Sequence, residues 1–212
     1  LRPNDDQTSP IISQSEESPV APTEVYAASK LTGEQIVLQK NEKDLKHVCL
    51  RLATFYRVEC RDAVAPNLFL RAALRGDDTL QIHGSGTQTR TYTYVSDIVS
   101  GIVAVVEQEE AAPYYPVLNV SHPSAYSVLE LAHMVMGVVG VRMDCLHTPD
   151  RPGQIYKEQF ETSRLQSLGW RAKVSLEDGL KAMRDAFLKK ETEAVLATIG
   201  DDVGATVSQL GC

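Results

Sequence analysis

"HVCLRLATFY", residues 47 to 56, is the stretch that most clearly indicates the fold class. It is a run of apolar and β-branched residues, too short and too uninterrupted for a surface helix, so it predicts a buried strand. Upstream, apolar residues recur at helical spacing and predict a helix from Val25 to about Lys43. A helix followed by a buried strand is the order found where a crossover helix covers a parallel sheet, so the sequence indicates an α/β protein.

The same alternation of helices and strands continues downstream. Residues 67–75 predict a helix that stops at Gly76, because glycine readily adopts the left-handed conformation that closes a helix. Ser96 is the expected N-cap of a later helix, with Asp97 favourably placed in its first turn. The other expected elements are short strands on either side of a Gly-Ser-Gly turn within 77–97, strands within 115–121 and 143–149, a helix over 127–140 capped by Ser127, and a last amphipathic helix over 175–191.

Composition and charge exclude several function classes. The formal charge is -7, from 21 basic and 28 acidic residues, which argues against a nucleic-acid partner because such binding depends on a basic surface. The four cysteines show no metal-ligand spacing and form no cluster with the five histidines, so no metal site is predicted. No apolar run approaches the ~18 residues that span a bilayer. We therefore expect a soluble, cytoplasmic protein with reduced thiols and no membrane partner.

Tyr26 and Lys30 lie four positions apart in "TEVYAASKLTGEQ", residues 23–35, so one helical turn places them over the same patch of surface. A tyrosine phenol is a poor base at neutral pH because its ordinary pKa is ~10. An ammonium group nearby favours the phenolate, which could exchange a proton with a substrate hydroxyl or carbonyl. On spacing alone, the alternative is a half-buried tyrosine ring beside a solvated lysine.

Three motifs occur in order along the chain. The first is "PVAPTEVYAASKLTGE", residues 19–34, with its Tyr-x-x-x-Lys pair. The second is "LQIHGSGTQTRTYTYVSDIVSGI", residues 80–102, with a Gly-x-Gly-x-Gln-x-Arg segment, and the third, residues 149–180, has an Arg-Pro-Gly loop and a Leu-Gly-Trp turn. Together they resemble the extended short-chain dehydrogenase/reductase family of NAD-dependent sugar-nucleotide epimerases, dehydratases and decarboxylases. The resemblance covers roughly residues 15–190.

The resemblance implies roles for individual residues. In that family, the tyrosine matching Tyr26 acts as acid and base on the sugar, and the lysine matching Lys30 lowers the tyrosine's pKa and bonds the nicotinamide ribose. The arginines matching Arg90 and Arg151 hold the diphosphate of the nucleotide sugar. A planar guanidinium suits that role because two of its N–H groups can meet two phosphate oxygens. For each arginine, a surface ion pair is the alternative.

Further site residues follow from the same resemblance. Asn67 matches an asparagine that lines the nucleotide pocket, with a simple helix cap as the alternative. His83 stands where the family often has an aromatic residue near the base. Thr54 replaces an asparagine at the end of a strand that approaches the cofactor, so it is expected to bind the cofactor. Asp97 and Trp170 are expected to be structural, through helix capping and through packing of the last helices.

Two departures from the family pattern bear on activity. Arg57 stands at a glycine position, where a side chain could forbid a positive φ and block close approach of cofactor and sugar. The Gly-rich turn that holds a dinucleotide pyrophosphate does not occur in the sequence. We therefore expect that about half of the nucleotide-binding sheet is missing, that the chain is the C-terminal portion of a longer enzyme, and that alone it binds dinucleotide poorly.

The implied fold is α/β, with a partial Rossmann-like parallel sheet and a smaller α/β sugar-nucleotide-binding domain. Residues 1–60 would form the last part of the Rossmann-like domain. Residues 61–190 would form mainly the sugar-nucleotide domain, with some elements returning to the sheet. Residues 191–212 are expected to be a mobile or loosely docked C-terminal extension.

The implied activity is that of an NAD- or NADP-dependent sugar-nucleotide epimerase, dehydratase or decarboxylase. Such enzymes act through transient hydride transfer and a keto-sugar intermediate. The isolated chain is expected to be inactive. Its partners would be a nucleotide-diphosphate sugar and a second copy, because family members commonly dimerise through the Tyr/Lys helix and its neighbour. The alternative is a non-catalytic relative that binds a nucleotide sugar or a protein, motivated by Arg57 and the missing Gly-rich turn. The nucleotide, the sugar and the choice of NAD or NADP stay open.

Overall fold

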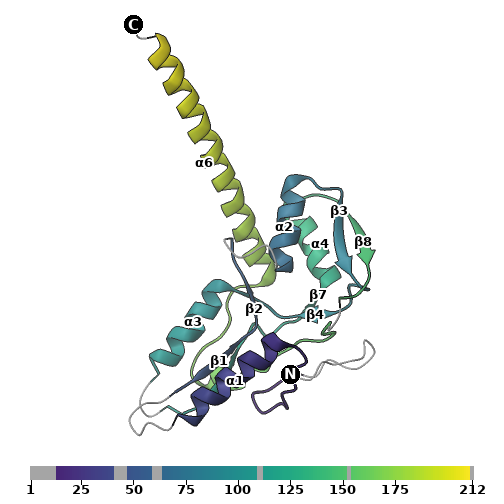
Figure 1. Ribbon diagram of the computed structural model, residues 1–212, viewed down its shortest axis with the longest axis vertical. Helices are drawn as coiled ribbons and strands as arrows, with labels where there is room; N and C mark the ends of the chain where they lie inside the picture. Colours follow the sequence, from purple (N-terminus) through teal and green to yellow (C-terminus); the bar gives the residue numbers. More distant parts are fainter. Residues whose placement is uncertain (1–12, 41–46, 59–63, 109–111, 152–153, 211–212) are drawn as a thin grey trace.

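The computed structural model describes residues 13–40, 47–58, 64–108, 112–151 and 154–210, with side chains as far as Glu193. Helices and strands alternate along the chain (Figure 1), and the strands pair into short two-stranded sheets, which confirms the α/β class. The helices are α1 (Val25–Gln39), α2 (Ala65–Arg75), α3 (Val95–Val106), α4 (Val128–Val139), α5 (Ser163–Ser167) and α6 (Leu176–Leu210). The strands are β1 (Cys49–Leu52), β2 (Thr54–Tyr56), β3 (Thr79–His83), β4 (Thr89–Arg90), β5 (Tyr92–Tyr94), β6 (Val117–Val120), β7 (Tyr126–Ser127) and β8 (Asp144–Thr148).

The single strand predicted over 47–56 is divided in the structure. β1 pairs in parallel with β6, and β2 pairs in parallel with β5. The amide of Ala53 donates to the carbonyl of Val120 (3.0 Å), so the pairing with β6 ends where β2 begins. The expectation of a buried strand is wrong for Phe55, which is exposed although Tyr56 is fully buried. Successive side chains of a strand point to opposite faces, and only one face of β2 meets the core.

Helix α1 ends at Gln39, before the expected Lys43, because Lys40 takes extended backbone angles (φ -69°, ψ 109°). None of the side chains of α1 is fully buried. The guanidinium of Arg51 on β1 donates from Nε and Nη2 to the two carboxylate oxygens of Glu34 (2.9 and 2.7 Å). This forked hydrogen bonding fastens α1 to β1 and holds the pKa of Glu34 below its ordinary value.

One hydrophobic cluster surrounds β1, β6, α3 and α5. Its buried members are Ile98, Val105, Leu118, Val120, Leu165 and Trp170. The indole Nε1 of Trp170 donates to Oγ of Ser100 (2.9 Å) and ties the segment before α6 to α3. The predicted packing role of Trp170 is confirmed.

Asp97 is structural, but it does not cap a helix as predicted. Helix α3 starts directly after β5 with Tyr94 at its N-cap, so Ser96 is not the cap. Asp97 is buried, and its Oδ2 accepts hydrogen bonds from the backbone N–H groups of Lys173 (3.0 Å) and Val174 (2.9 Å). The carboxylate therefore anchors the segment that leads into α6.

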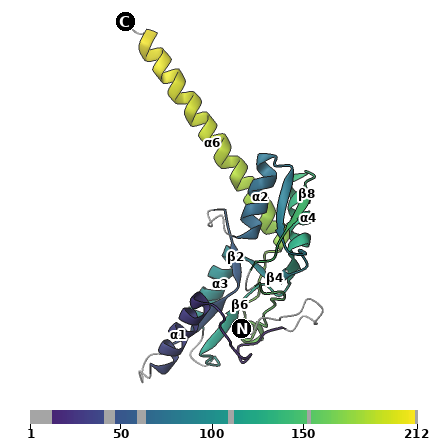
Figure 2. The ribbon, with the colours of Figure 1, turned by 45° about the vertical axis from the view of Figure 1, so that its right-hand side comes forward.

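A second hydrophobic cluster forms where α2, α4 and the start of α6 pack beside the parallel pair β3–β8 (Figures 1 and 2). Its fully buried side chains include Leu70, Ile82, Leu131, Val135, Leu180 and Met183. The predicted end of α2 at Gly76 is confirmed by a left-handed φ of 77°. The predicted cap of α4 is confirmed too, because Ser127 and Glu130 form a complete capping box.

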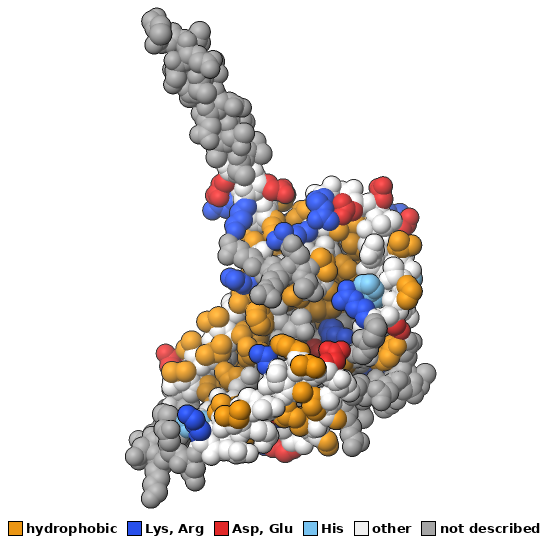
Figure 3. All heavy atoms as spheres, viewed as in Figure 1, with side chains coloured by type: hydrophobic (Ala, Val, Ile, Leu, Met, Phe, Trp, Pro, Cys, Tyr) orange, Lys and Arg blue, Asp and Glu red, His pale blue; other side chains and the backbone are white. Residues whose placement is uncertain are grey.

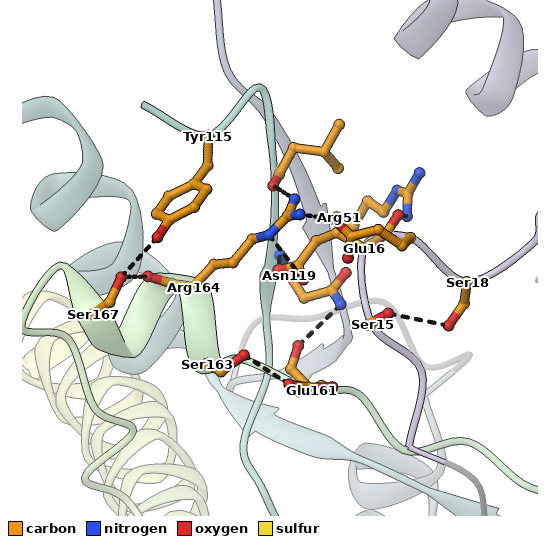
Figure 4. A network of polar contacts seen from close by, with 12 residues as sticks. Ser15, Glu16, Ser18, Arg51, Tyr115, Asn119, Glu161, Ser163, Arg164 and Ser167 are labelled. Carbon is orange, nitrogen blue, oxygen red and sulfur yellow. Dashed lines mark hydrogen bonds and ion pairs between the residues drawn. The ribbon is translucent and has the colours of Figure 1, made fainter. Parts of the chain in front are cut away.

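The segment before α1 is held against β6 by polar contacts (Figure 4). Asn119 donates its side-chain amide to the carbonyls of Gln14 (3.1 Å) and Glu161 (3.0 Å). Its backbone N–H donates to Oε1 of Glu16 (2.9 Å), and Arg164 of α5 lies 3.8 Å from Oε2 of the same carboxylate. Glu16 is thus a buried carboxylate with a cationic and an amide partner, as a buried charge requires.

Helix α6 begins in the second cluster, where Leu176, Leu180 and Met183 are buried, and then projects away from the body of the protein (Figures 1 and 2). The residues from 191 onward, for which we expected a mobile or loosely docked extension, continue this helix as far as Leu210. Within the described ranges, no helix combines the length and the apolar character that a bilayer crossing needs.

Candidate functional site

A pocket of about 670 Å³ opens between helix α2 and the strands β3, β4 and β5. Four residues predicted for the site from sequence line it: Thr54, His83, Arg90 and Arg151. The α2 side is apolar, with Leu68, Phe69 and Ala72, and the opposite side is polar. Figure 3 shows basic side chains and a histidine near one another on this face of the molecule, with apolar side chains around them.

Arg90 is held firmly in the pocket wall. Its Nη1 donates to the carbonyls of Thr89 (2.8 Å) and Ile155 (2.6 Å), and its Nε lies 4.0 Å from Oε2 of Glu158. Among the described residues, no protein acceptor meets its Nη2. Only 20% of the side chain is exposed, so the alternative of a surface ion pair does not describe it. The guanidinium is fixed from one side and keeps a donor for a ligand.

Glu158 lies behind Arg90 and outside the pocket lining. Its side chain is 13% exposed, and its Oε1 accepts from the hydroxyl of the fully buried Thr91 (3.3 Å). Burial raises the pKa of Glu158, while Arg90 and the hydrogen bonds from Thr91 work in the opposite direction. The carboxylate therefore supports the arginine without itself facing the pocket.

His83 and Gln88 form another part of the polar wall. Nδ1 of His83 lies 2.9 Å from Oγ1 of Thr148. Gln88 is buried, and its Nε2 donates to the carbonyl of His83 (2.8 Å). That bond fixes the amide orientation and leaves Oε1 without a partner among the described residues. An unpaired buried acceptor costs free energy, so Oε1 of Gln88 is suited to receive a hydrogen bond from a ligand.

Asn67 lies close behind the start of α2. It is fully buried, and its Nδ2 donates to the carbonyl of Arg57 (2.7 Å). The alternative of a helix cap is wrong, because Val64 occupies the N-cap position and Asn67 already lies inside the helix. Asn67 is not among the side chains that line the pocket. A direct substrate contact therefore stays a prediction.

The predicted closeness of Tyr26 and Lys30 is confirmed, because Nζ of the lysine lies 5.3 Å from the centroid of the tyrosine ring. The alternative of a half-buried ring is wrong, since Tyr26 is 71% exposed. Neither residue lines the pocket. Their proton-transfer role stays a prediction, and the structure leaves both groups open to solvent and to a ligand.

Arg57 does not create the strain that the sequence suggests. It follows β2 directly, is exposed, and does not line the pocket. No described residue other than glycine has a positive φ, so the backbone at Arg57 is in an ordinary conformation. A side chain at this position is compatible with the local backbone.

Sequence reasoning missed two residues of the site. Gln88 belongs to the Gly-x-Gly-x-Gln-x-Arg motif, and its place two residues before Arg90 could have indicated it, because alternate residues of an extended chain share a face. Glu158 had no such signal, since it meets Arg90 only through folding. In the part of the chain that the structure describes, no group of three or more His, Cys, Asp or Glu side chains is arranged to hold a metal ion.

Within the described residues, three short parallel sheets flanked by helices, with an arginine-bearing pocket beside them, indicate a partial Rossmann-like α/β fold. The chain belongs to the NAD dependent epimerase/dehydratase family, whose sequence model matches residues 3–121.

Curated relatives are similar over part of their length. UDP-glucuronic acid decarboxylase 5 of Arabidopsis thaliana is 32% identical over 134 residues, which are 62% of this chain and 37% of the relative. UDP-glucuronic acid decarboxylase 1 of Danio rerio is 28% identical over 177 residues, which are 82% of this chain and 41% of the relative. The chain thus spans about two fifths of the curated relatives that it matches.

Solved structures share the fold. UDP-glucose 4-epimerase of Thermotoga maritima, determined with UDP-glucose, matches with a TM-score of 0.76 and 26% identity over 87% of this chain and 60% of that chain. UDP-glucuronic acid 4-epimerase of Bacillus cereus, in complex with UDP-glucuronic acid and NAD, matches with a TM-score of 0.74 and 28% identity over 82% of this chain and 55% of that chain. The chain therefore has part of the fold of these enzymes.

Proposed function

We propose that this chain binds a nucleoside-diphosphate sugar in the pocket beside Arg90, as a portion of an NAD-dependent sugar-nucleotide epimerase, dehydratase or decarboxylase. The observation that carries the proposal is the fixed guanidinium of Arg90, which keeps a donor on the pocket side while its other contacts are satisfied within the protein. Because the chain spans only part of its relatives, the activity belongs to the proposal.

The diphosphate would lie between Arg90 and Arg151, two of the three described arginines that line the pocket; the third, Arg75, is paired with Asp77 (2.7 Å). Arg90 offers a pre-oriented donor, so little side-chain entropy is lost when an anion binds. Arg151 is exposed at the edge of the same pocket and would close on the anion from the other side. Charge-assisted hydrogen bonds of this kind are about twice as strong as neutral ones.

The base would lie against the apolar wall of α2. Leu68, Phe69 and Ala72 form a surface suited to the flat face of a nucleobase. His83 and Gln88 lie opposite, and Oε1 of Gln88 would accept a hydrogen bond from the base or the ribose. The pocket thus offers an apolar face, an acceptor and the guanidinium groups of Arg90 and Arg151, which are the groups that a nucleoside diphosphate needs.

The names of the relatives direct the choice of substrate. The curated relatives are UDP-glucuronic acid decarboxylases, and one solved neighbour is a UDP-glucuronic acid 4-epimerase in complex with UDP-glucuronic acid and NAD. UDP-glucuronic acid is therefore the substrate that we propose first, with decarboxylation as the reaction.

Tyr26 and Lys30 would act on the sugar from helix α1. As phenolate, the Tyr26 oxygen would take a proton from a sugar hydroxyl and become the phenol, and the ammonium group of Lys30, which lies over the ring, would donate to the nicotinamide ribose. The pair of exposed donors on one helix face fits that end of NAD, with Thr54 in the pocket wall as a further cofactor contact. NAD supplies the hydride acceptor when bound.

Calorimetry with the 212-residue chain tests the binding proposal. UDP-glucuronic acid and UDP-glucose should bind, and Arg90→Lys should weaken binding at least about tenfold, because lysine cannot reproduce the oriented donor. Arg171→Lys is the matched control, since Arg171 also donates from Nη1 to two carbonyls but lies outside the pocket. Absence of binding by the folded wild-type chain, or equal effects of both variants, would refute the proposal.

The second candidate is a non-catalytic relative that binds a nucleotide sugar. Arg57 is its motive: the backbone there is unstrained, and the exposed side chain would have to block the approach of cofactor or sugar. The two candidates differ in the effect of Tyr26→Phe. In a preparation that turns over UDP-glucuronic acid with NAD, this change should lower kcat by about 10²–10⁴ and leave UDP-glucose affinity unchanged. Unchanged turnover would favour the non-catalytic candidate.

We also propose a homodimer formed through α1. This helix exposes the large apolar side chains of Val25 (87%) and Ile36 (58%). Burying such a surface against a second copy removes it from water. Light scattering should give twice the chain mass of 23.3 kDa. Ile36→Asp should give the monomer, whereas the control Leu146→Asp, on β8, should not. A monomeric wild type would contradict the dimer.

The cytoplasm is the proposed location. The described cysteines, Cys49 and Cys145, are free thiols, as expected in a reducing compartment. Fluorescence microscopy of a tagged chain would test this, and accumulation in a secretory compartment would contradict it.

A further inference from the structure

The carboxylate of Glu158 lies on one side of Arg90, and the pocket lies on the other side. Glu158 contacts Nε of the guanidinium (4.0 Å) and the hydroxyl of Thr91 (3.3 Å), yet it does not line the pocket. The carbonyls of Thr89 and Ile155 occupy Nη1. One cation thus has a fixed negative partner behind it and room for a second negative group in front.

A diphosphate at Arg90 would compete with this carboxylate for the same positive charge. Like charges that share one cation disfavour each other's ionised form, so the weaker acid takes up a proton. We propose that Glu158 is a positioning residue that orients Arg90 and becomes protonated when a diphosphate ligand binds there. The inference rests on the proposed function, because it requires the diphosphate to lie at Arg90.

The surroundings of Glu158 favour this response. Burial already raises the pKa of its carboxyl group, and Arg90 is the cation that opposes the rise. Burial and the negative charge of Glu158 raise the pKa of the Tyr92 phenol on β5, so that phenol stays neutral at working pH. Ligand binding removes part of the attraction of Arg90 for Glu158 and raises the carboxyl pKa further. Affinity should therefore be highest at low pH and fall as pH rises through the pKa of the bound state.

Calorimetry in buffers of different ionisation enthalpy measures the protons taken up on binding. UDP-glucose is the probe, because its diphosphate carries no group that titrates between about pH 5 and pH 8. The wild-type chain should take up protons and lose about threefold to tenfold in affinity across that range. Glu158→Gln keeps the shape and an acceptor for Thr91, and it should bind without proton uptake, with the low-pH affinity of the wild type at every pH.

Two further variants separate Glu158 from other groups. His83→Gln removes the imidazole that lines the pocket and could also bind a proton, and proton uptake must persist in it. Glu161→Gln changes an exposed carboxylate nearby and should match the wild type.

Uptake that disappears with His83→Gln, or persists in Glu158→Gln, overturns the inference. If Glu158→Gln does not fold, the wild-type chain decides, because binding without proton uptake overturns the inference while leaving the proposed function intact. Failure of the folded wild-type chain to bind UDP-glucose overturns both.

Discussion

Replacing Gly179 of α6 by alanine would force a methyl group against Tyr56 of β2. A Cβ at this position would overlap Oη of Tyr56 and lie 2.8 Å from its Cζ. The ring is fully buried, so it has no free space to move into. Overpacking of this kind costs about 1–3 kcal/mol, and the better helix propensity of alanine returns about 1 kcal/mol. The expected net loss in the free energy of unfolding is therefore up to about 2 kcal/mol.

Urea unfolding followed by circular dichroism measures this loss. Gly137→Ala in α4 is the matched control, because its Cβ would meet no atom within 4 Å, and it should stabilise the protein by about 0.5–1 kcal/mol. In the Tyr56→Phe background, part of the overlap is gone, so the cost of Gly179→Ala should fall by about 1 kcal/mol. The reasoning is refuted if Gly179→Ala behaves like Gly137→Ala, or if its cost is equal in both backgrounds.

Three further changes test local interactions. Glu34→Gln should lower the urea midpoint at about pH 7, and the difference from the wild type should disappear as pH falls. Arg51 lowers the folded-state pKa of Glu34, so the ionised carboxylate stabilises the fold above the ordinary carboxyl pKa. This stabilisation is lost as pH falls through the folded-state pKa. Asp97→Ala should cost about 3 kcal/mol of unfolding free energy, measured by urea, since two backbone N–H groups lose a charged acceptor. Ser127→Ala should cost about 1 kcal/mol in the same assay, because it removes the capping box with Glu130.

Each of these results has a contradicting outcome. If the difference in urea midpoint between Glu34→Gln and the wild type does not change with pH, the charge of Glu34 is not what stabilises α1. An unchanged free energy of unfolding in Asp97→Ala would mean that the hydrogen bonds from Lys173 and Val174 do not anchor the segment that leads into α6. Undiminished helix stability in Ser127→Ala would mean that packing alone fixes the start of α4.

Local signals predicted the helices better than the strands. Gly76 and Ser127 marked the end of α2 and the start of α4, because a C-terminal glycine and an N-cap serine act within a few residues. The division of residues 47–56 could not be predicted, since β1 and β2 choose different partners, β6 and β5, far along the chain. The start of α3 was misjudged because β5 runs into it without a loop, so Ser96 has no turn to cap.

The site shows the same division between local and long-range information. Arg90 and His83, which lie in one sequence motif, both line the pocket, and helical spacing alone placed Lys30 over Tyr26. The partner of Arg90 could not be predicted, because Glu158 comes from an irregular segment before α5 with no periodic pattern. The distance between α1 and the pocket could not be predicted either, because other elements form the pocket.

The connection between β1 and β2 constrains how the molecule could move. Ala53 is the one residue between them, and its amide is bonded to Val120. Extended chain covers about 3.3 Å per residue, so no slack exists there. A hinge between the two hydrophobic clusters could not open at this point without breaking the pairing of β1 with β6 or of β2 with β5. Bending at this connection could therefore not bring the Tyr26 phenol nearer to a sugar in the pocket.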